Sequence, residues 1–527
     1  MNPSATDATL SPAAKFFLFI LVAAFAVVAW WGLEWRLLQD TPLFHYIALL
    51  INEHGYVPYR DVFETSMPGT LLFHVAITSL LGYGDLAFRL FDLFWLAALT
   101  ATTWFVMRRI AVPVAWFASF GFALAYLLFG QDMALQRDYL GLLPIALALL
   151  TAGQQKFSLS QAAIIVGALF GFAAAIKPHL GIGLPIVFLY MLAQRGQLQS
   201  VRQACAPVIK TGLLTTLGFV PVFAMPLIWL WSNGGLHSFI EMFTQYLPLH
   251  VNMTGLGSTV TREEHFTYSL KKLWHGTRYI APPAVFGVLV AMLFGALSDS
   301  ARRLAVTLAC LLLAYCIYAA LGGKFWLYHW VPFRYFAILC AALMLSPLKV
   351  PQAKLIEPAL LVGFVATLTI WVSLEGYARQ WLAIPASIRP QLAGKPPYPP
   401  KGGRVDEIAE WLISANLQPG DRVQPLDWAE SVVHSMLLAR AKPATPYIYD
   451  YYFYHYISDP YIQTMRARFI ADLKQEPPRF IIRTVGGQLR PSGLDTTDRF
   501  VELEEILNEN YETATTGERY EILELKQ

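Results

Sequence analysis

Six acidic or basic residues stand at the ends of apolar segments of this chain: Asp40, Asp138, Lys177, His179, Lys324 and His329. An ionisable group at the edge of a bilayer is unfavourable unless it is paired, hydrated or used in chemistry, at about 2.5–3.5 kcal/mol for Arg, Lys or Asp at a helix centre. The topology deduced below places all six on one face of the membrane. The sequence therefore predicts a charged pocket that can hold an anion and accept a proton.

The composition indicates that membrane spans position these residues. Of the 527 residues, 56% are hydrophobic and only 14% are charged, against roughly 25% charged in an ordinary soluble domain. The mean hydropathy is +0.45. The sequence therefore predicts a polytopic α-helical membrane protein with lipids among its partners. The net charge of +3, without a dense stripe of Lys and Arg, gives no support to nucleic-acid binding.

Crossing a hydrocarbon core of about 30 Å takes about 20 apolar residues, and counting runs of that length predicts about eleven transmembrane helices. The runs are 16–34, 88–107, 112–130, 139–155, 160–176, 180–194, 211–231, 281–298, 303–321, 331–347 and 356–374. The shorter segment 70–84 is interpreted as a re-entrant or interfacial helix. The first run is interpreted as an uncleaved span because Trp30 and Trp31 mark an interface; a cleaved signal peptide is the alternative.

Leaving segment 70–84 out of the spans places the basic clusters on the cytoplasmic side, as the positive-inside rule requires. These clusters are Arg108/Arg109, Lys156, Arg195/Arg202/Lys210, Arg302/Arg303 and Lys349/Lys354. The N-terminus is then cytoplasmic, and the residues named at the outset are extracytoplasmic. We expect a multi-pass protein of the bacterial inner membrane.

Three parts are predicted along the chain. Residues 1–374 form the transmembrane domain with an extracytoplasmic first loop, 35–87; residues 375–402 form a Pro-rich linker; residues 403–527 form an extracytoplasmic α/β domain. The small domain is expected to contain helices near 404–416, 429–440 and 457–475, and strands after 421 and near 479–483, 511–516 and 519–525. Within the first loop, Leu43, Ile47, Leu50 and Ile51 have helical spacing, which predicts an amphipathic helix on the membrane surface.

The first loop carries the candidate general base. Asp40 follows the first span, where a partly desolvated carboxylate can accept a proton from a hydroxyl group. The alternative is that Asp40 caps the helix that Thr41-Pro42 begins. Further along, Arg60, Asp61 and Glu64 lie in a Pro-punctuated extended loop and are candidate substrate-binding residues.

Two further pairs stand at span ends. Arg137 and Asp138 offer a cation beside a carboxylate, suited to a phosphate, a sugar hydroxyl or, with less support, a divalent cation. The alternative is an ordinary helix start with the interfacial Tyr139. Lys177 and His179 flank a helix-breaking Pro and suit an anionic headgroup, whereas a terminal Lys can also simply extend to the interface.

The segment 322–335 combines glycines with several aromatic and basic residues at a span entrance. Its candidate ligands are Lys324, Tyr328, His329 and Arg334. An interfacial aromatic belt explains the Trp and Tyr residues but not three basic groups, so binding of a sugar phosphate is favoured. The Tyr-rich segment 447–456 suits stacking on saccharides, or alternatively a seam between domains. No Cys has metal-ligand spacing, and no metal ligand is assigned.

Taken together, these motifs resemble the GT-C superfamily of polyprenyl-phosphate-sugar-dependent glycosyltransferases, in the branch of the protein mannosyltransferases and the lipid A aminoarabinose transferases. The shared elements, in chain order, are Asp40 after the first span, Gly-Tyr-Val-Pro-Tyr-Arg-Asp at 55–61, Met-Pro-Gly at 67–69, Gly-Asp-Leu-Ala-Phe-Arg-Leu at 84–90, Gln-Arg-Asp-Tyr at 136–139, Ile-Lys-Pro-His at 176–179, Leu-Tyr-His-Trp-Val-Pro at 327–332, and Pro-Gly-Asp-Arg-Val and Pro-Pro-Arg-Phe-Ile-Ile in the tail.

The resemblance implies an inverting transfer of a hexosyl or pentosyl unit from a polyprenyl-phosphate donor to a hydroxyl group of a glycan, lipid or protein acceptor, on the non-cytoplasmic face. It implies that Asp40 is the base, although many members carry an acidic pair where this chain has Asp40-Thr41. The basic residues would stabilise the departing phosphate. A transporter or flippase for a lipid-linked or anionic solute is the alternative, and it would place paired charges at the membrane midplane.

Overall fold

The computed structural model describes residues 10–198, 201–255, 257–372, 374, 404–427, 431–485 and 491–526. The predicted Pro-rich linker, 375–402, lies outside these residues. By their contacts, the residues form two compact units. Unit 1 comprises Met1–Trp35, Asp85–Met225 and Leu270–Ala386, and unit 2 comprises Arg36–Gly84, Pro226–Ser269 and Ser387–Gln527. The first loop therefore shares a unit with the C-terminal domain.

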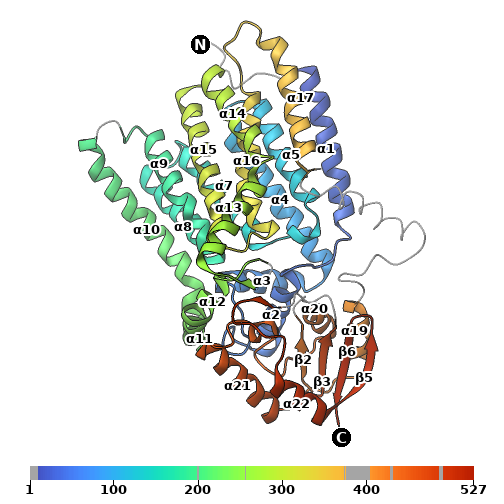
Figure 1. Cartoon of the computed structure of the whole chain (residues 1–527). Helices are drawn as coiled ribbons and strands as arrows, with labels where there is room; N and C mark the ends of the chain where they lie inside the picture. The colour runs from blue at the N-terminus through green and yellow to red at the C-terminus, as the bar shows by residue number, and fades with distance from the viewer. Residues whose placement is uncertain are drawn as a thin grey trace. The chain divides into compact units, whose positions relative to one another are not determined.

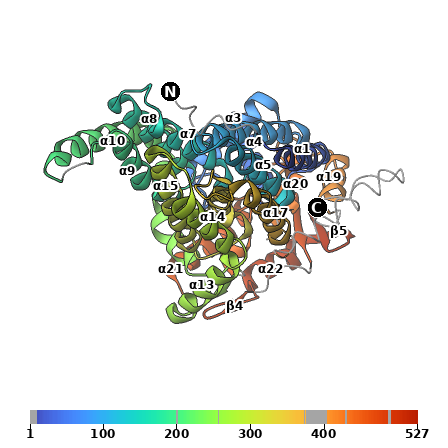
Figure 2. The same ribbon diagram turned by 90° about the horizontal axis from the view of Figure 1, so that it is seen from above.

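Unit 1 is a bundle of apolar helices, shown side by side in Figure 1 and seen from one end in Figure 2. An apolar helix stands at each of the eleven predicted runs: α1 (Pro12–Gly32), α4 (Asp85–Met107), α5 (Val112–Leu128), α7 (Leu142–Gly153), α8 (Leu159–Ile176), α9 (Leu184–Gln194), α10 (Val201–Ser232), α14 (Ala281–Phe294), α15 (Asp299–Leu321), α16 (Val331–Ala342) and α17 (Ala353–Val372).

The multi-pass membrane character of the chain is confirmed by the length of these helices. In the described part of the chain, seven helical segments are long and apolar enough to cross a membrane, one of them Leu327–Leu345 around α16. The number is eight if the bent pair α13 (Arg262–Thr277) and α14 is one span. The other predicted spans are shorter helices, because breaks such as Pro178 divide the apolar runs.

Glycines bring α8 and α10 into close contact. A Cβ atom added at Gly167 would lie 2.0 Å from a carbonyl oxygen of α10, and one at Gly171 would lie 2.5 Å from another. A Cβ atom added at Gly218 of α10 would likewise lie 2.1 Å from a carbonyl oxygen of α8. Small residues four apart allow such approaches between membrane helices. The outer face of α10 is exposed, with Leu213 68% and Leu217 61% accessible, as expected for a lipid-facing surface.

Two of the predicted cytoplasmic cations meet at the C-terminal end of α7. Arg109 donates a hydrogen bond to the Leu150 carbonyl at 3.0 Å, and Arg195 donates to the carbonyls of Ala152 at 2.7 Å and Gln154 at 2.9 Å. Cations at this position satisfy terminal carbonyls and interact favourably with the helix dipole. The opposite end of α7 follows Asp138, so Arg109 and Arg195 lie at the other end of the helix from that residue.

In unit 2, the first loop forms α2 (Thr41–His54) and α3 (Pro68–Leu81). The prediction that α2 is an amphipathic surface helix is wrong, because every residue from Thr41 to Leu50 is buried. Its non-apolar side is covered as well: the Tyr46 hydroxyl donates to the Ala441 carbonyl at 2.8 Å, and His45 packs against His74 of α3. The spacing of Leu43 and Ile47 identified one buried face but not the partners that cover the others.

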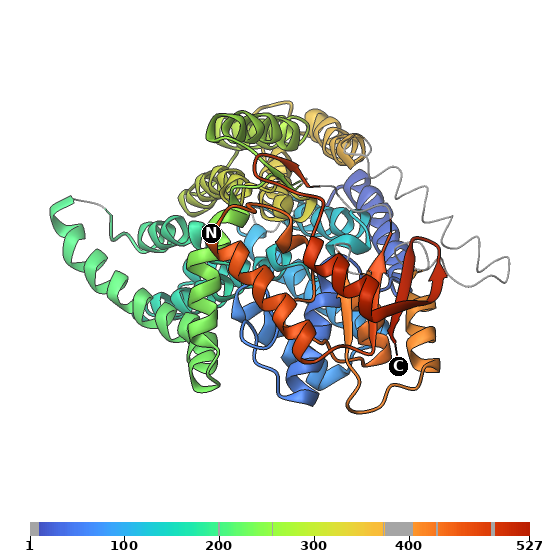
Figure 3. The ribbon, with the colours of Figure 1, turned by 60° about the horizontal axis from the view of Figure 1, so that its bottom comes forward.

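The C-terminal domain contributes a four-stranded sheet with the order β2 (Val423–Leu426), β3 (Phe480–Thr484), β6 (Tyr520–Leu525) and β5 (Tyr511–Gly517). Strands β2 and β3 are parallel, and the remaining pairs are antiparallel. The helices are α19 (Arg404–Ser414), α20 (Ser431–Ala439), α21 (Pro460–Gln475) and α22 (Val501–Asn510). Figure 3 views unit 2 with α21 and α22 in front. The predicted helices and strands are confirmed, whereas α22 was not predicted.

The Tyr-rich segment is mostly interior. Tyr447, Tyr452 and Phe453 are buried, and the Phe63 ring of the first loop lies 4.9 Å from the Tyr452 ring and 5.7 Å from the Tyr447 ring. The Phe63 amide also donates to the Pro446 carbonyl at 2.8 Å. These rings therefore join the first loop to the tail within unit 2, which favours the seam over the saccharide platform.

Candidate functional site

A buried carboxylate, an ammonium group and a phenol converge at one end of unit 1. Lys177 Nζ donates to both carboxylate oxygens of Asp138, at 2.8 Å and 3.0 Å, and the Tyr318 hydroxyl donates to Asp138 Oδ1. The Asp138 side chain is fully buried, and that of Lys177 is 16% exposed. The ammonium also lies 5.3 Å from the centre of the Tyr318 ring. The carboxylate thus holds a cation that retains a path to solvent or ligand.

Helix ends position this cluster. A capping box between Ser158 and Gln161 begins α8, and the helix ends at Lys177, whose backbone is extended because Pro178 follows. Asp138 lies in the short helix α6 (Arg137–Leu140), and Tyr318 lies in the last turn of α15. Three breaks in apolar helices therefore bring polar side chains to the same end of the bundle.

Two histidines lie beside the cluster. His179 is exposed, and its ring lies 6.5 Å from the Tyr318 ring. His329 is buried against Tyr328, with ring centres 4.8 Å apart, and Arg137, Asp138, Lys177 and His179 are its charged neighbours. Asp138, Lys177, His179 and His329 are therefore neighbours within unit 1, whereas their place on one face of the membrane stays a prediction.

Lys324 lies in the connection between α15 and the 3₁₀ helix Leu327–Trp330 that precedes α16. The side chain is buried, and burial lowers its pKa to about 7. A desolvated ammonium group loses its proton more readily than an exposed one. The charge of Lys324 is therefore largest on the acidic side of neutral pH.

Arg334 has a different environment. Its guanidinium lies 4.8 Å from the Phe129 ring centre and 5.8 Å from that of Trp371, and Nη1 donates to the Leu327 carbonyl at 3.3 Å. Stacking on two aromatic rings and capping a carbonyl are packing roles. The binding of a sugar phosphate by Arg334 stays a prediction.

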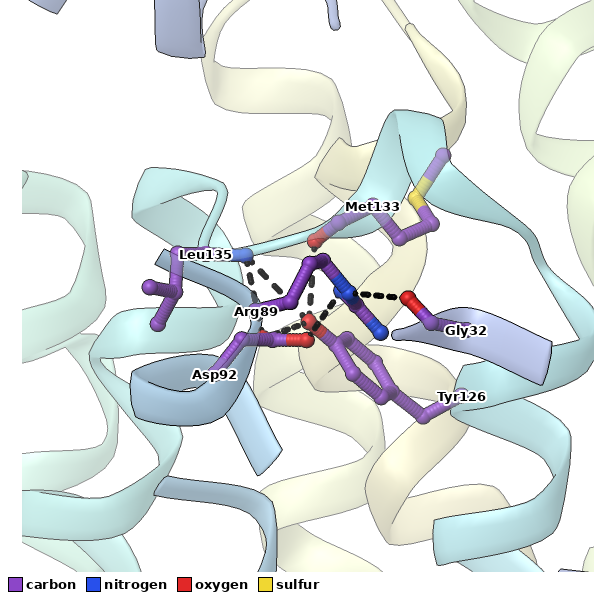
Figure 4. Close-up of polar contacts among 6 residues, drawn as sticks. All are labelled: Gly32, Arg89, Asp92, Tyr126, Met133 and Leu135. Atoms are coloured by element: carbon purple, nitrogen blue, oxygen red, sulfur yellow. Dashed lines mark hydrogen bonds and ion pairs between the residues drawn. The ribbon is translucent and has the colours of Figure 1, made fainter. Parts of the chain in front are cut away.

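A second buried ion pair lies in unit 1, and the sequence analysis missed it (Figure 4). Arg89 Nη1 donates to Asp92 Oδ2 at 2.5 Å, and neither side chain is exposed. Arg89 Nε donates to the Gly32 carbonyl at 2.8 Å. The Tyr126 hydroxyl donates to Asp92 Oδ1 at 2.5 Å. Arg89 and Asp92 are three residues apart within an apolar run, and this spacing is typical of an ion pair within one helix. The sequence analysis interpreted the run only as a membrane span.

This network orders the segment that leads to Asp138. Asp92 Oδ1 accepts from the Leu135 amide at 3.3 Å, and Leu135 has a left-handed backbone with φ of 47°. A bulky side chain rarely adopts that conformation, so the surrounding bonds must hold it. The Tyr126 ring also stacks on Tyr139 at 4.0 Å. The network of Arg89, Asp92 and Tyr126 therefore holds Leu135, which precedes the Arg137-Asp138 pair, and Tyr139, which follows it.

The predicted first-loop residues lie in unit 2. Asp40 is half-buried at the N-cap of α2, and its side chain makes no capping hydrogen bond there. Arg60 and Asp61 pair with each other through two hydrogen bonds of 2.8 Å, and Asp61 also accepts from the Val57 amide. Glu64 is buried and accepts from the Ser66 amide and hydroxyl. Asp61 and Glu64 therefore hold the turns of the loop.

Metal ligation finds no support from grouped side chains. Among the residues that the structure describes, no group of three or more His, Cys, Asp or Glu side chains can hold a metal ion. Asp138, the carboxylate for which a divalent cation was considered, has Lys177 and Tyr318 as hydrogen-bond partners.

The likeness of this structure to solved structures extends over nearly the whole chain. It covers 97% of this chain and 98% of ArnT from Cupriavidus metallidurans bound to undecaprenyl phosphate, with 14% identity and a TM-score of 0.56. The apo state of the same protein is matched with a TM-score of 0.52. The mycobacterial arabinofuranosyltransferase AftD is matched at 14% identity over 99% of this chain and 42% of AftD, with a TM-score of 0.49. No protein-family model and no curated protein sequence matches the chain.

These comparisons define the class of the fold. The chain is a polytopic membrane protein with the fold of ArnT. The likeness to ArnT takes in most of the C-terminal domain of this chain as well, since 97% of the chain is covered.

The bond from Tyr318 to Asp138 gives a prediction about stability. Replacing Tyr318 with Phe removes a hydrogen bond to a charged group, so we expect the free energy of unfolding to fall by about 1.5–3 kcal/mol. Tyr315, one turn earlier, donates to the neutral Leu180 carbonyl at 2.9 Å and is the matched control. Its Phe variant is expected to lose about 1 kcal/mol. Thermal unfolding in detergent measures both, and equal losses would contradict a charged Asp138.

Proposed function

We propose that this protein is an inverting glycosyltransferase that moves a sugar from a polyprenyl-phosphate carrier to a hydroxyl acceptor. The observation that carries the proposal is the convergence of Lys177, His179 and His329 around a buried carboxylate, in a fold shared with a protein bound to undecaprenyl phosphate. An apolar carrier lies naturally against a lipid-exposed bundle, and its phosphate requires cations at a bundle end.

The donor phosphate is assigned to the Asp138 cluster. Lys177 supplies the charge that meets the leaving phosphate, and Asp138 and Tyr318 hold the ammonium group in place. Cations placed in advance in a poorly solvated site stabilise charge that develops on a leaving oxygen. Lys324 is a second candidate, with a charge that depends on pH near neutrality.

Asp40 is assigned as the general base. Its carboxylate takes the proton from the acceptor hydroxyl, the hydroxyl oxygen forms a bond to the anomeric carbon, and the bond to the phosphate oxygen breaks with its electron pair passing to the phosphate. A single displacement inverts the anomeric centre. Asp40 is half-buried at the N-cap of α2, so this position combines partial shelter from solvent with a carboxylate that can accept a proton.

The reaction is assigned to the non-cytoplasmic face of a bacterial inner membrane, with the N-terminus in the cytoplasm. The positions of Arg109 and Arg195 at the end of α7 remote from Asp138 support this orientation. The acceptor is a glycan, a lipid or a protein hydroxyl group. The transferred sugar is a hexose or a pentose.

The test is transfer by the purified protein in proteoliposomes, with radiolabelled undecaprenyl-phosphate sugars and extracted envelope glycans, lipids and proteins as acceptors. Label that moves to an acceptor supports the proposal. Label that stays on the carrier but changes leaflet would favour the flippase instead. Runs with Mg²⁺, Mn²⁺ or EDTA decide whether a divalent cation is needed.

Lys177 gives the second prediction. The double variant Lys177→Gln/Asp138→Asn removes both charges without leaving either one buried alone. We expect the donor KM to rise about 10- to 150-fold, the equivalent of one charged hydrogen bond to phosphate. Lys210→Gln, which removes an exposed cation of α10, is the control and should leave KM unchanged. An unchanged donor KM in the double variant would remove this cluster from the donor site.

A further inference from the structure

Unit 2 contains a polar cavity of about 520 Å³ to which the proposed reaction assigns no role. The end of α2, the turn 56–61, the segment 443–446 and α21 form its walls. Its volume is within the roughly 300–1,000 Å³ typical of small-molecule sites. Aromatic and ionisable side chains line it, among them His54, Tyr56, Arg422, Arg468, Asp472 and Glu476.

One wall is a rigid turn. Gly55 has a left-handed backbone with φ of 68°, ends α2 and directs His54 and Tyr56 to the cavity. The adjacent Arg60 is tied to Asp61 by two hydrogen bonds and to the Asn233 carbonyl by a third, at 3.1 Å. This wall is therefore organised before any ligand binds.

The opposite wall is one face of α21. Arg468, Asp472 and Gln475 are spaced by four and three residues, so their side chains share a helix face, and Glu476 follows at the C-cap. Burial raises the pKa of Asp472, and Arg468 opposes that shift. The described residues offer no hydrogen-bond partner to Asp472 Oδ2 or to the buried Nη1 of Arg422. Polar atoms of this kind are costly unless something satisfies them.

The charges indicate the class of ligand. Three guanidinium groups (Arg60, Arg422 and Arg468) and three carboxylates (Asp61, Asp472 and Glu476) line the cavity, so the formal charges cancel. A site for phosphate alone would carry a clear excess of cations. Alternating planar donors and acceptors instead match the paired hydroxyl groups of a sugar, and Tyr56 and His54, with ring centres 6.4 Å apart, offer apolar faces.

We propose that this cavity is a saccharide-binding subsite that takes an uncharged segment of an oligosaccharide. Its use for the acceptor glycan rests on the proposed glycosyltransferase function, whereas binding itself does not. The subsite selects acceptors that carry a glycan chain and keeps them on the protein between encounters with the donor.

The experiment measures binding by the full-length protein in detergent. Maltotetraose, cellotetraose, chitotetraose and mannotetraose are the probes, with inorganic phosphate as the anionic comparison, and saturation-transfer NMR and calorimetry are the readouts. We expect at least one tetrasaccharide to bind, and Arg468→Ala and Asp472→Asn each to weaken it by about tenfold or more. Lys474→Ala, on the same helix but not lining the cavity, should bind like the wild type.

The outcomes separate this proposal from the proposed function. The subsite is overturned if no tetrasaccharide binds or if only phosphate binds. It is also overturned if Arg468→Ala and Asp472→Asn bind tetrasaccharide as tightly as the wild type. Sugar transfer to simple acceptors without tetrasaccharide binding would leave the enzyme assignment standing and remove the subsite. Tetrasaccharide binding without any sugar transfer would leave the subsite standing and remove the enzyme assignment. Unchanged thermal unfolding of the variants shows that weaker binding is not misfolding.

Discussion

Replacing Asp40 with Asn is expected to slow sugar transfer by about 10²- to 10⁴-fold while leaving thermal unfolding nearly unchanged. The amide has the shape of the carboxylate but cannot take a proton from the acceptor hydroxyl, and loss of a general base has an effect of this size. Stability should persist because Asn is as good a residue as Asp at the N-cap of α2. Single-turnover transfer in proteoliposomes measures the rate.

The control for Asp40 is Asp299→Asn. Asp299 is an exposed carboxylate in the first turn of α15, where Ser298 already provides the cap. It should show wild-type transfer. If Asp40→Asn loses no more than about threefold in turnover, the effect is far smaller than that expected for a general base. Such a result would exclude Asp40 from the chemical step. A lowered unfolding temperature in that variant would point to a structural role instead.

Replacing Asp92 with Ala is expected to lower the free energy of unfolding by about 3–5 kcal/mol. The substitution leaves the guanidinium of Arg89 buried without its carboxylate, which costs more than the pair itself contributes. The Tyr126 hydroxyl and the Leu135 amide lose an acceptor as well. Thermal unfolding in detergent measures the loss, and transfer should fall with it because the segment carrying Asp138 is released.

The double variant Arg89→Met/Asp92→Leu separates charge from packing. Two apolar residues of similar volume leave no buried charge, so most of the lost stability should return. The bond from the Leu135 amide would still be missing, and we therefore expect transfer to stay low. Equal instability of the single and double variants would show that the shape of these side chains, rather than the buried charge, stabilises this part of the bundle.

Much of the fold could be predicted because it follows from run length and composition. Each predicted span is an apolar helix, and the tail forms the expected sheet, since hydrophobic runs and Pro-Gly turns act locally. The burial of α2 could not be predicted in this way. Residues such as Tyr46 are covered by segments distant in the sequence, and no local periodicity reports a partner such as Ala441.

The candidate site shows the same division. Asp138, Lys177 and His329 each lie next to one end of an apolar run, on the same predicted face of the membrane. Their proximity therefore followed from the predicted topology. Tyr318 was missed because a Tyr near a helix end is typical of an interfacial belt. Arg89 and Asp92 were missed because their mutual neutralisation allows a charged pair to lie inside a helix that otherwise resembles an ordinary span.

The burial of α2 by the tail has a consequence for biosynthesis. Tyr46 and the carbonyl that it contacts are separated by 395 residues. At a synthesis rate of about 5–20 residues per second, the ribosome needs roughly 20–80 s to produce the second partner after the first. During that interval α3 already packs against one side of α2, but the side that the tail covers stays open. A chaperone or the lipid surface must therefore shelter that side until the C-terminal domain emerges.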